Sequence, residues 1–412
     1  HHALSQNAQR KPEERSADGQ QAADQYRRYA SYFPQDAQAP EAQFLLGDLL
    51  YERGDLPGAI KAYETAAYDY PNFGRRSDAG FAALQAYQKR EAALSGAEQT
   101  AWKRQRLNAD LRFATSFPQR KESAQIQSNA AAGLFEAGDL APALAAAEAV
   151  TRNADADDAS RRVAWRVIGH ASFDKGDYAR AEAAYIQVQK LAPAGSPPDQ
   201  EIAERLAAAI YRQGEQAQAS GQALQAAEHF SRVAAEAPET KIRVTADYDA
   251  AMATLKAGKP AQAIPMLLAF RQQHAGDPLV SEVTRTLATT YEKTGNPGAA
   301  AGELQRIAET PGADPTLQRE ALWHSAELLQ PSDPAAAERA LRQYVERYPQ
   351  PFDIAIEGYQ KLVDLAAKSG QEDVRADWGR RLVNFEAAGG DQRTERSRAL
   401  AARASLLPAQ TA

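Results

Sequence analysis

The sequence contains no cysteine among its 412 residues. Disulfide bonds, thiolate metal sites and cysteine nucleophiles are therefore excluded for this chain. The Val, Ile and Thr alternation that marks β-strands is scarce, and no apolar run approaches the length of a membrane-spanning helix. Much of the 44% hydrophobic fraction is instead alanine, which is the best helix former and allows helices to approach closely. The composition therefore favours an all-α chain.

Charge of one sign is also lacking. Lys and Arg number 48 and are interspersed with 54 Asp and Glu, so the formal net charge is only −6. A surface that binds phosphates normally appears as a basic stripe, and none is evident in the sequence. We therefore expect no nucleic-acid partner.

Enzyme motifs are absent from the sequence as well. It has no phosphate-binding glycine loop, nucleophile elbow, paired-histidine zinc signature or dinucleotide fingerprint. The acidic residues at 155 to 158 lack the glycine and the distal glutamate of a calcium loop, so we expect them to cap a helix. The sequence thus predicts a protein that is not an enzyme and has no cofactor or metal site. His1 and His2 are interpreted as a purification-tag remnant, and the other histidines are expected to lie scattered: His170, His229, His274 and His324.

A repeated pattern of helix breakers is present along the chain. Apolar segments end at proline in YASYFPQ, AAYDYPN, FATSFPQ, VQKLAPA, VAAEAPE and YVERYPQ, because proline cannot continue a helix. Midway between these ends lie glycines, which are expected to close the first helix of a pair in a left-handed conformation. From Gly138 to Gly295 their spacing is 37 to 45 residues, which is the size of a helix-turn-helix repeat. These glycines are Gly54, Gly138, Gly176, Gly221, Gly258, Gly295 and Gly370.

These residues resemble the tetratricopeptide repeat family. One unit matches its pattern with Leu46, Gly47, Gly54, Ala59, Tyr63, Ala66 and Pro71, and another with Trp165, Ile168, Gly169, Gly176, Ala181, Tyr185 and Pro193. The resemblance implies a right-handed superhelical solenoid of about nine helix hairpins, with the first helices lining a concave wall. Gly47 and Gly169 are expected where paired helices approach most closely, and Tyr63 and Tyr185 to fill the gap toward the next unit.

The solenoid is predicted over residues 18 to 388. Residues 1 to 17 are expected to be the tag remnant with a flexible or degenerate segment, and residues 389 to 412 a capping helix and tail. Some units are lengthened, and residues 199 to 220 are expected to form one extended first helix. No second globular domain is expected.

The family resemblance also implies where a partner would bind, which is the exposed face of the first helices. Aromatic side chains mixed with Arg, Gln and His suit peptide recognition, because they provide large contact area with few rotors. The clamp of lysines and asparagines that some family members use for a terminal carboxylate is not expected, since Asp48 and Gln85 take those positions. The predicted partner-binding residues are Phe44, Asp48, Tyr51, Phe81, Gln85, Gln88, Ser128, Phe135, Arg166, His170, Phe173, Tyr211, Tyr248 and Arg285, with Glu292 beside them.

We therefore predict a non-catalytic scaffold that binds a helix or extended peptide of a partner protein. The tyrosine-proline helix ends resemble bacterial envelope proteins of the family, the outer-membrane assembly lipoprotein and cell-division coordinator types. A periplasmic location is expected, with association to the outer membrane if an N-terminal anchor is present, and the cytoplasm is the alternative. A second hypothesis is a scaffold region of an exopolysaccharide-secretion or outer-membrane-pore assembly.

Overall fold

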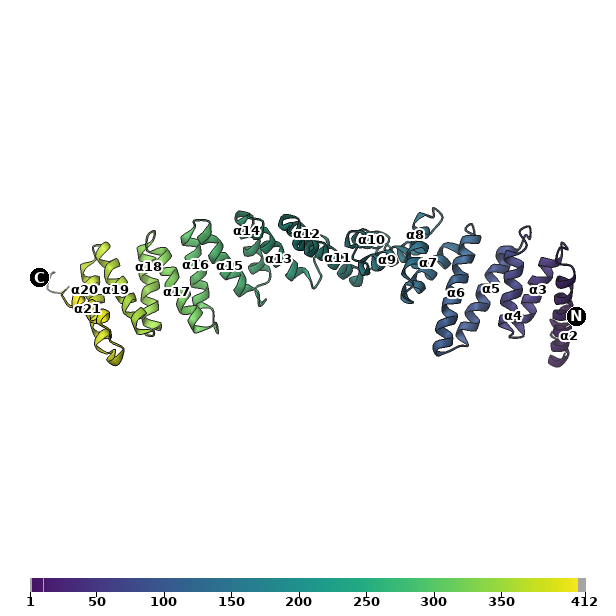
Figure 1. Ribbon diagram of the computed structural model, residues 1–412, viewed down its shortest axis with the longest axis horizontal. Coiled ribbons are helices and arrows are strands. Elements are labelled where there is room, and N and C mark those ends of the chain that lie inside the picture. Colours follow the sequence, from purple (N-terminus) through teal and green to yellow (C-terminus); the bar gives the residue numbers. More distant parts are fainter. Residues whose placement is uncertain (1, 10, 407–412) are drawn as a thin grey trace. The chain divides into compact units, whose positions relative to one another are not determined.

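The computed structural model describes residues 2–9 and 11–406, and these form helices joined by short turns with no strand (Figure 1). The prediction of an all-α chain with about nine hairpins is confirmed. The pairs are α3 (Ala39–Glu52) with α4 (Leu56–Tyr68), α5 (Arg76–Ala92) with α6 (Gly96–Ser116), α7 (Ser123–Glu136) with α8 (Leu140–Arg152), α9 (Asp158–Asp174) with α10 (Tyr178–Lys190), α11 (Gln200–Ala219) with α12 (Ala223–Glu236), α13 (Arg243–Lys256) with α14 (Pro260–Gln273), α15 (Val280–Lys293) with α16 (Pro297–Glu309), α17 (Pro315–Leu329) with α18 (Pro334–Arg347), and α19 (Phe352–Lys368) with α20 (Glu372–Ala387).

The glycine breakers lie where the sequence predicts them. All seven have a positive φ, between 67° and 83°, in the turn between the helices of a pair. A Cβ added at any of them would meet no atom within 4 Å, so the backbone conformation and not lack of space calls for glycine. An aspartate often follows and caps the second helix, as Asp55 does by accepting a hydrogen bond from the backbone N of Gly58 at 3.0 Å.

The hairpins are held together by close contact between a first-helix glycine and a second-helix aromatic ring. A Cβ added at Gly47 would lie 2.5 Å from the Tyr63 ring, and one at Gly169 would lie 2.6 Å from the Tyr185 ring. Tyr63 and Tyr185 therefore pack within their own hairpins, and Tyr63 also belongs to a core cluster that contains Ala79 and Ala83 of the next unit. That both rings fill the gap toward the next unit stays a prediction. The glycine is what leaves room for each ring.

The chain divides into two compact units, one ending at Arg212 and the other beginning at Gln213. We call them unit 1 and unit 2. In each, the helices pack mainly against their neighbours in the sequence. Their boundary falls inside α11, which extends over Gln200–Ala219 as one helix, as the sequence predicts.

A short helix packs at each end of the described chain. Helix α1 (His2–Ser5) packs on α2 (Pro12–Tyr32). Helix α2 begins six residues before residue 18, where the solenoid was expected to begin. At the other end α21 (Glu395–Ser405) packs on α20 and buries Ala401 and Ala404 beside Leu382. The predicted tail, residues 407 to 412, lies outside the described residues.

Candidate partner-binding site

Helix α9 presents three of the predicted residues on one face. Asp157 caps the start of the helix by accepting a hydrogen bond from the backbone N of Ser160 at 2.6 Å, as the sequence predicts for the acidic residues at 155 to 158. Spacings of four and three residues along a helix place side chains on the same side. Arg166, His170 and Phe173 therefore form one partly exposed stripe.

The α9 stripe contacts the neighbouring first helices of unit 1. The Phe135 ring of α7 stacks on the His170 ring with centroids 5.8 Å apart. On the other side, the Arg205 guanidinium of α11 lies 5.9 Å from the Phe173 centroid. Two successive first helices, α7 and α9, thus share one partly exposed aromatic surface, and α11 adds a basic side chain to it. We call it the α9 face, and its residues are Phe135, Arg166, His170, Phe173 and Arg205.

His170 is held as a neutral ring within this face. Its Nδ1 and the Tyr185 hydroxyl form a hydrogen bond of 3.0 Å. Burial, followed by the positive charge of Arg205, lowers the pKa of His170 below its usual value. The ring is therefore uncharged at neutral pH and offers an aromatic surface for contact, with no net charge to repel a cation or attract an anion.

The predicted residues on α3 and α5 occupy mixed environments. Asp48 accepts a hydrogen bond from the Tyr63 hydroxyl at 2.7 Å, which makes it part of the hairpin structure. Lys89 Nζ lies 4.2 Å from the centroid of the Tyr51 ring, so these two side chains join α3 to α5. Phe81 packs against Phe113 and lies under Arg120. Gln85 and Gln88 are exposed.

Two predicted site residues do not lie on an exposed face. Phe44 is 6% exposed, because Tyr63 and Phe73 pack against its ring and the Arg75 guanidinium covers it at 4.2 Å. Ser128 is fully buried, and its hydroxyl donates to the backbone O of Gln125. The prediction of exposure is wrong for both.

Three further predicted residues lie in unit 2. The Tyr248 ring packs edge-on against Phe270 with centroids 6.0 Å apart. Arg285 is exposed and pairs with Glu282, and Glu292 pairs with His324 at 3.0 Å. These residues are not gathered into one surface by any contact among them. Tyr211, in unit 1, is half-buried on α11.

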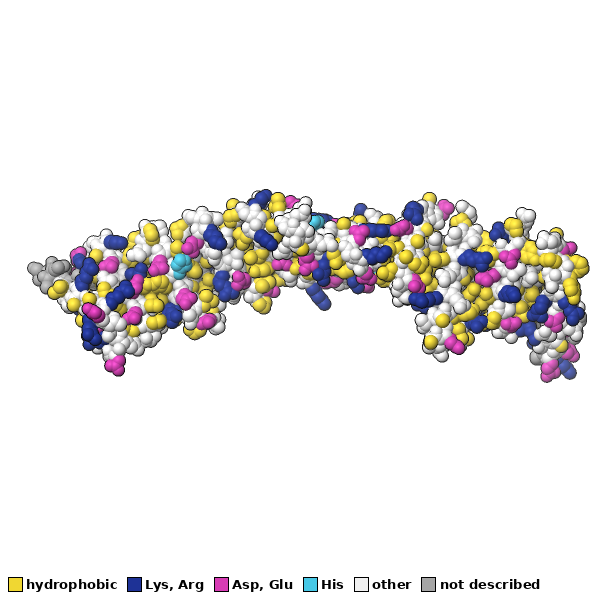
Figure 2. Space-filling model, viewed as in Figure 1, with side chains coloured by type: hydrophobic (Ala, Val, Ile, Leu, Met, Phe, Trp, Pro, Cys, Tyr) yellow, Lys and Arg dark blue, Asp and Glu magenta, His cyan; other side chains and the backbone are white. Residues whose placement is uncertain are grey.

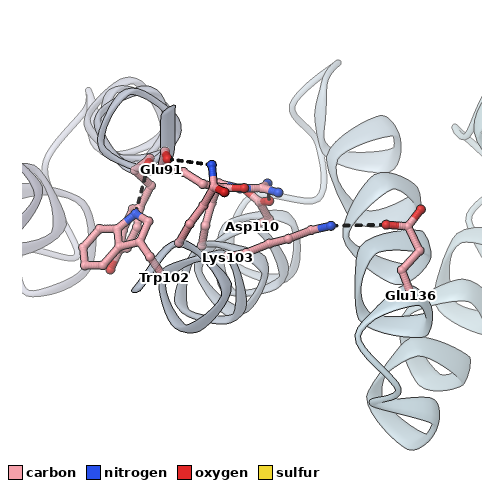
Figure 3. Close-up of polar contacts among 8 residues, drawn as sticks. Glu91, Trp102, Lys103, Asp110 and Glu136 are labelled. Atoms are coloured by element: carbon pink, nitrogen blue, oxygen red, sulfur yellow. Dashed lines mark hydrogen bonds and ion pairs between the residues drawn. The ribbon is translucent and has the colours of Figure 1, made fainter. Parts of the chain in front are cut away.

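The sequence interpretation missed a polar cluster between α5 and α6 (Figure 3). Arg106 bridges Glu91 of α5 and Asp110 of its own helix, and Asp110 is only 4% exposed. Burial raises the pKa of Asp110 to about 7, against the lowering effect of the Arg106 charge. Nearby Lys103 pairs with Glu136 at 3.2 Å, which ties α6 to α7. The available signal was an aspartate at helical spacing within the apolar stripe that includes Leu107.

Comparisons with known proteins agree with this geometry. Family models described as tetratricopeptide repeat match residues 13–72 and 248–316, residues 164–194, and residues 320–351. The chain carries tetratricopeptide repeats. No curated protein matches the sequence.

Solved structures of tetratricopeptide repeat proteins are similar at low identity. One is a tetratricopeptide repeat protein from Parabacteroides merdae, with 14% identity, 70% of this chain and 99% of that chain covered, and a TM-score of 0.27. Another is PilW, a type IV pilus biogenesis factor, with 17% identity, 55% and 94% coverage, and a TM-score of 0.25. A third is PilF of Pseudomonas aeruginosa, with 15% identity, 56% and 94% coverage, and a TM-score of 0.23.

Tetratricopeptide repeats generally bind protein partners and typically act as scaffolds without catalysis. In the described part of this repeat chain, no three His, Asp or Glu side chains are grouped to hold a metal ion, and no helix is both long and apolar enough to cross a membrane. On the face that Figure 2 shows, basic and acidic side chains are interspersed over the repeats. Four of the predicted binding residues meet on the α9 face, namely Phe135, Arg166, His170 and Phe173.

Proposed function

We propose that this tetratricopeptide repeat chain is a scaffold that docks a helical or extended segment of a partner protein across the α9 face. The observation that carries the proposal is the row of partly exposed rings over two successive first helices, Phe135 on α7 and His170 and Phe173 on α9, with Arg205 of α11 beside Phe173. Such rings supply contact area at low cost in side-chain entropy, and the adjacent Arg166 and Arg205 supply planar hydrogen-bond donors.

The proposal includes a cellular setting, which is a bacterial cell-envelope complex with the chain in the periplasm. It rests on the tyrosine-proline helix ends of the sequence, which are AAYDYPN and YVERYPQ. Fractionation of the native host, followed by detection of the chain with an antibody, tests this part. Recovery in the cytoplasmic fraction alone would refute the location and leave the docking surface in place.

Site-specific photo-crosslinking in the native host tests the docking surface. The photoreactive phenylalanine analogue p-benzoylphenylalanine replaces Phe135 or Phe173, one at a time, so that each ring position is kept. Matched controls carry the same analogue at Ala145 of α8 or Ala183 of α10, which are exposed on second helices. We expect one partner to crosslink at both test positions and at neither control.

A second measurement uses the partner so identified. Phe173→Ala should weaken its binding at least several-fold while the circular dichroism spectrum stays unchanged, because Phe173 is only half-buried. Equal crosslinking at test and control positions, together with unchanged affinity of Phe173→Ala, would refute the assignment of the α9 face.

A further inference from the structure

A cationic pocket lies beside the α9 face, at the start of α9. Its volume is about 510 Å³, and it is formed by the first turns of α9 together with the end of α10 and the segment that follows. Three basic side chains line it against the single carboxylate of Asp158, so the pocket attracts anions. The basic side chains are Arg162, Arg166 and Lys190.

One carboxylate of the chain itself reaches the two arginines. Asp199 Oδ2 accepts hydrogen bonds from Nη2 of Arg162 at 3.1 Å and from Nη2 of Arg166 at 2.9 Å. Its other oxygen, Oδ1, accepts from the backbone N of Ile202 at 3.3 Å. A single oxygen therefore serves two guanidinium groups, although each group could bind a carboxylate with two parallel bonds.

The pairing leaves both arginines incompletely satisfied. Among the described residues, Nε of Arg162 and Nε of Arg166 are buried and have no acceptor. A buried donor without a partner is unfavourable, because it has lost its bonds to water and gained none in return. A ligand that brought a second carboxylate oxygen to these donors would remove that penalty.

We infer that this pocket binds a side-chain carboxylate of an acidic partner segment, which takes the place of Asp199 on Arg162 and Arg166. The inference rests on the proposed docking at the α9 face, since Arg166 is one helical turn from His170. Asp199 already shows that a carboxylate fits between the two guanidinium groups. The excess of positive charge in the lining supplies the complementarity for an incoming acid.

The segment that precedes Asp199 is exposed and makes few hydrogen bonds to the rest of the chain. It runs from Leu191 to Asp199, contains Pro193, Pro197 and Pro198, and is exposed over residues 193 to 198. Its hydrogen bonds from Ser196 go only to Pro193 within the same turn.

Releasing Asp199 Oδ2 from the arginines also affects the 3.3 Å bond from the backbone N of Ile202 to Oδ1, whereas the bond from the backbone N of Ala203 to the backbone O of Asp199 at 2.9 Å can remain. Asp199 therefore competes with a partner carboxylate for Arg162 and Arg166, and the partner must bind the two arginines more strongly than Asp199 does.

The test measures binding of a defined probe to the full chain by fluorescence anisotropy. The probe is a fluorescein-labelled peptide of alternating glutamate and alanine, and a peptide with glutamine in place of glutamate is its control. Asp199→Asn removes the competing charge but keeps Oδ1 as an acceptor for Ile202. We expect Asp199→Asn to bind the glutamate peptide about tenfold more tightly than the wild-type chain.

Substitution of the arginines tests whether the gain in affinity depends on them. Arg162→Gln or Arg166→Gln in the Asp199→Asn chain should abolish the gain, whereas Arg380→Gln in unit 2, an exposed arginine that also pairs with an acid, should leave it intact. Equal binding by Asp199→Asn and wild type, or a gain that survives both arginine changes, would overturn the inference. So would displacement of the probe by inorganic phosphate at a concentration where acetate has no effect, because a phosphate group would then be the preferred ligand.

The two proposals fail in different ways. If the partner crosslinks at Phe135 and Phe173 but its affinity is unchanged by Arg162→Gln, the α9 face is retained and the carboxylate pocket is rejected. If no partner crosslinks there while Asp199→Asn still tightens the glutamate peptide, the pocket stands and the docking surface is rejected.

Discussion

The hairpins α5/α6 and α9/α10 share one contact and differ in what surrounds it. In both, a ring of the second helix lies on a glycine of the first, Phe113 on Gly80 and Tyr185 on Gly169. Helix α10 has 13 residues, whereas α6 has 21. The additional turns of α6 carry Trp102, whose Nε1 donates to the backbone O of Tyr87, and they lead into the cluster around Asp110.

The contact between the first-helix glycine and the second-helix ring, which we call the crossing contact, therefore occurs in hairpins with different polar neighbours. Around Tyr185, the hydroxyl is hydrogen-bonded to a histidine kept neutral by burial. Around Phe113, the lengthened pair buries an aspartate beside a partly buried arginine in the same hairpin. A longer hairpin has more contact area between its two helices. It also places ionisable groups where their protonation changes the free energy of unfolding.

The largest expected effect comes from removing the rings. Phe113→Ala and Tyr185→Ala should each lower the free energy of unfolding by about 3–5 kcal/mol, because both side chains are fully buried. Urea unfolding followed by circular dichroism measures this. Leu224→Ala, at a residue 42% exposed, is the control and should change little. A loss below about 1 kcal/mol for either ring would show that the crossing contact is not shared.

The next largest effect is a pH dependence of stability that arises in the α5/α6 hairpin from Asp110. The pKa of Asp110, at about 7 in the folded chain, is raised above the ordinary 3.8. Its protonated form therefore stabilises the fold fully below pH 3.8, and that contribution is lost as the pH rises through 7. Asp110→Asn stays neutral, so its unfolding free energy relative to wild type should rise by up to about 3 kcal/mol between pH 4 and 8. Urea unfolding across this range measures it, and a difference that does not vary with pH would contradict the buried cluster.

Alanine substitutions at Gly169 and Gly80 test how closely the first helix approaches the ring in each hairpin. A Cβ at position 169 would lie 2.6 Å from the Tyr185 ring, and one at position 80 would lie 2.9 Å from the Phe113 ring. Gly169→Ala should therefore cost about 1–3 kcal/mol, and Gly80→Ala less. Gly302→Ala in α16 is the matched control, since no atom lies within 4 Å of its added Cβ. It should stabilise the chain by about 0.5–1 kcal/mol in thermal or urea unfolding, and a reversed order of the first two would contradict the ranking.

The smallest effect concerns how the first helices begin. Asp157 caps α9, whereas α5 follows Arg75, which makes no side-chain cap. Asp157→Ala should cost about 1 kcal/mol. The bonds from the Ser160 backbone hold the pKa of Asp157 below its usual value, so this contribution is present above pH 3.8 and disappears as the pH falls through the lowered pKa. Glu122→Ala, at the uncapped start of α7, should show neither effect in the same urea assay.

The repeat could be predicted from the sequence because its signals are local. Glycine before aspartate, proline after an aromatic residue, and an acidic cap are each read within a few residues, and Gly176 and Asp157 lie as predicted. Phe44 was misassigned because the residues that bury it, Phe73 and Arg75, come from the turn before α5 and have no fixed place in the repeat.

The parts of the site that could not be predicted depend on contacts between hairpins. The stacking of Phe135 on His170 joins residues 35 positions apart, and the spacing of either helix alone does not specify it. Asp199 reaches Arg166 from an irregular proline-rich segment, for which helical periodicity has no prediction. The role of the α9 face in binding stays a prediction.

The packing of helices mainly against their sequence neighbours has a consequence for synthesis in the cell. Native contacts are closed over short stretches of chain, so little loop entropy is lost before each one forms. A growing polypeptide can then complete each hairpin as soon as its second helix has left the ribosome. Early hairpins such as α3/α4 are therefore expected to acquire protease resistance while later ones are still being translated.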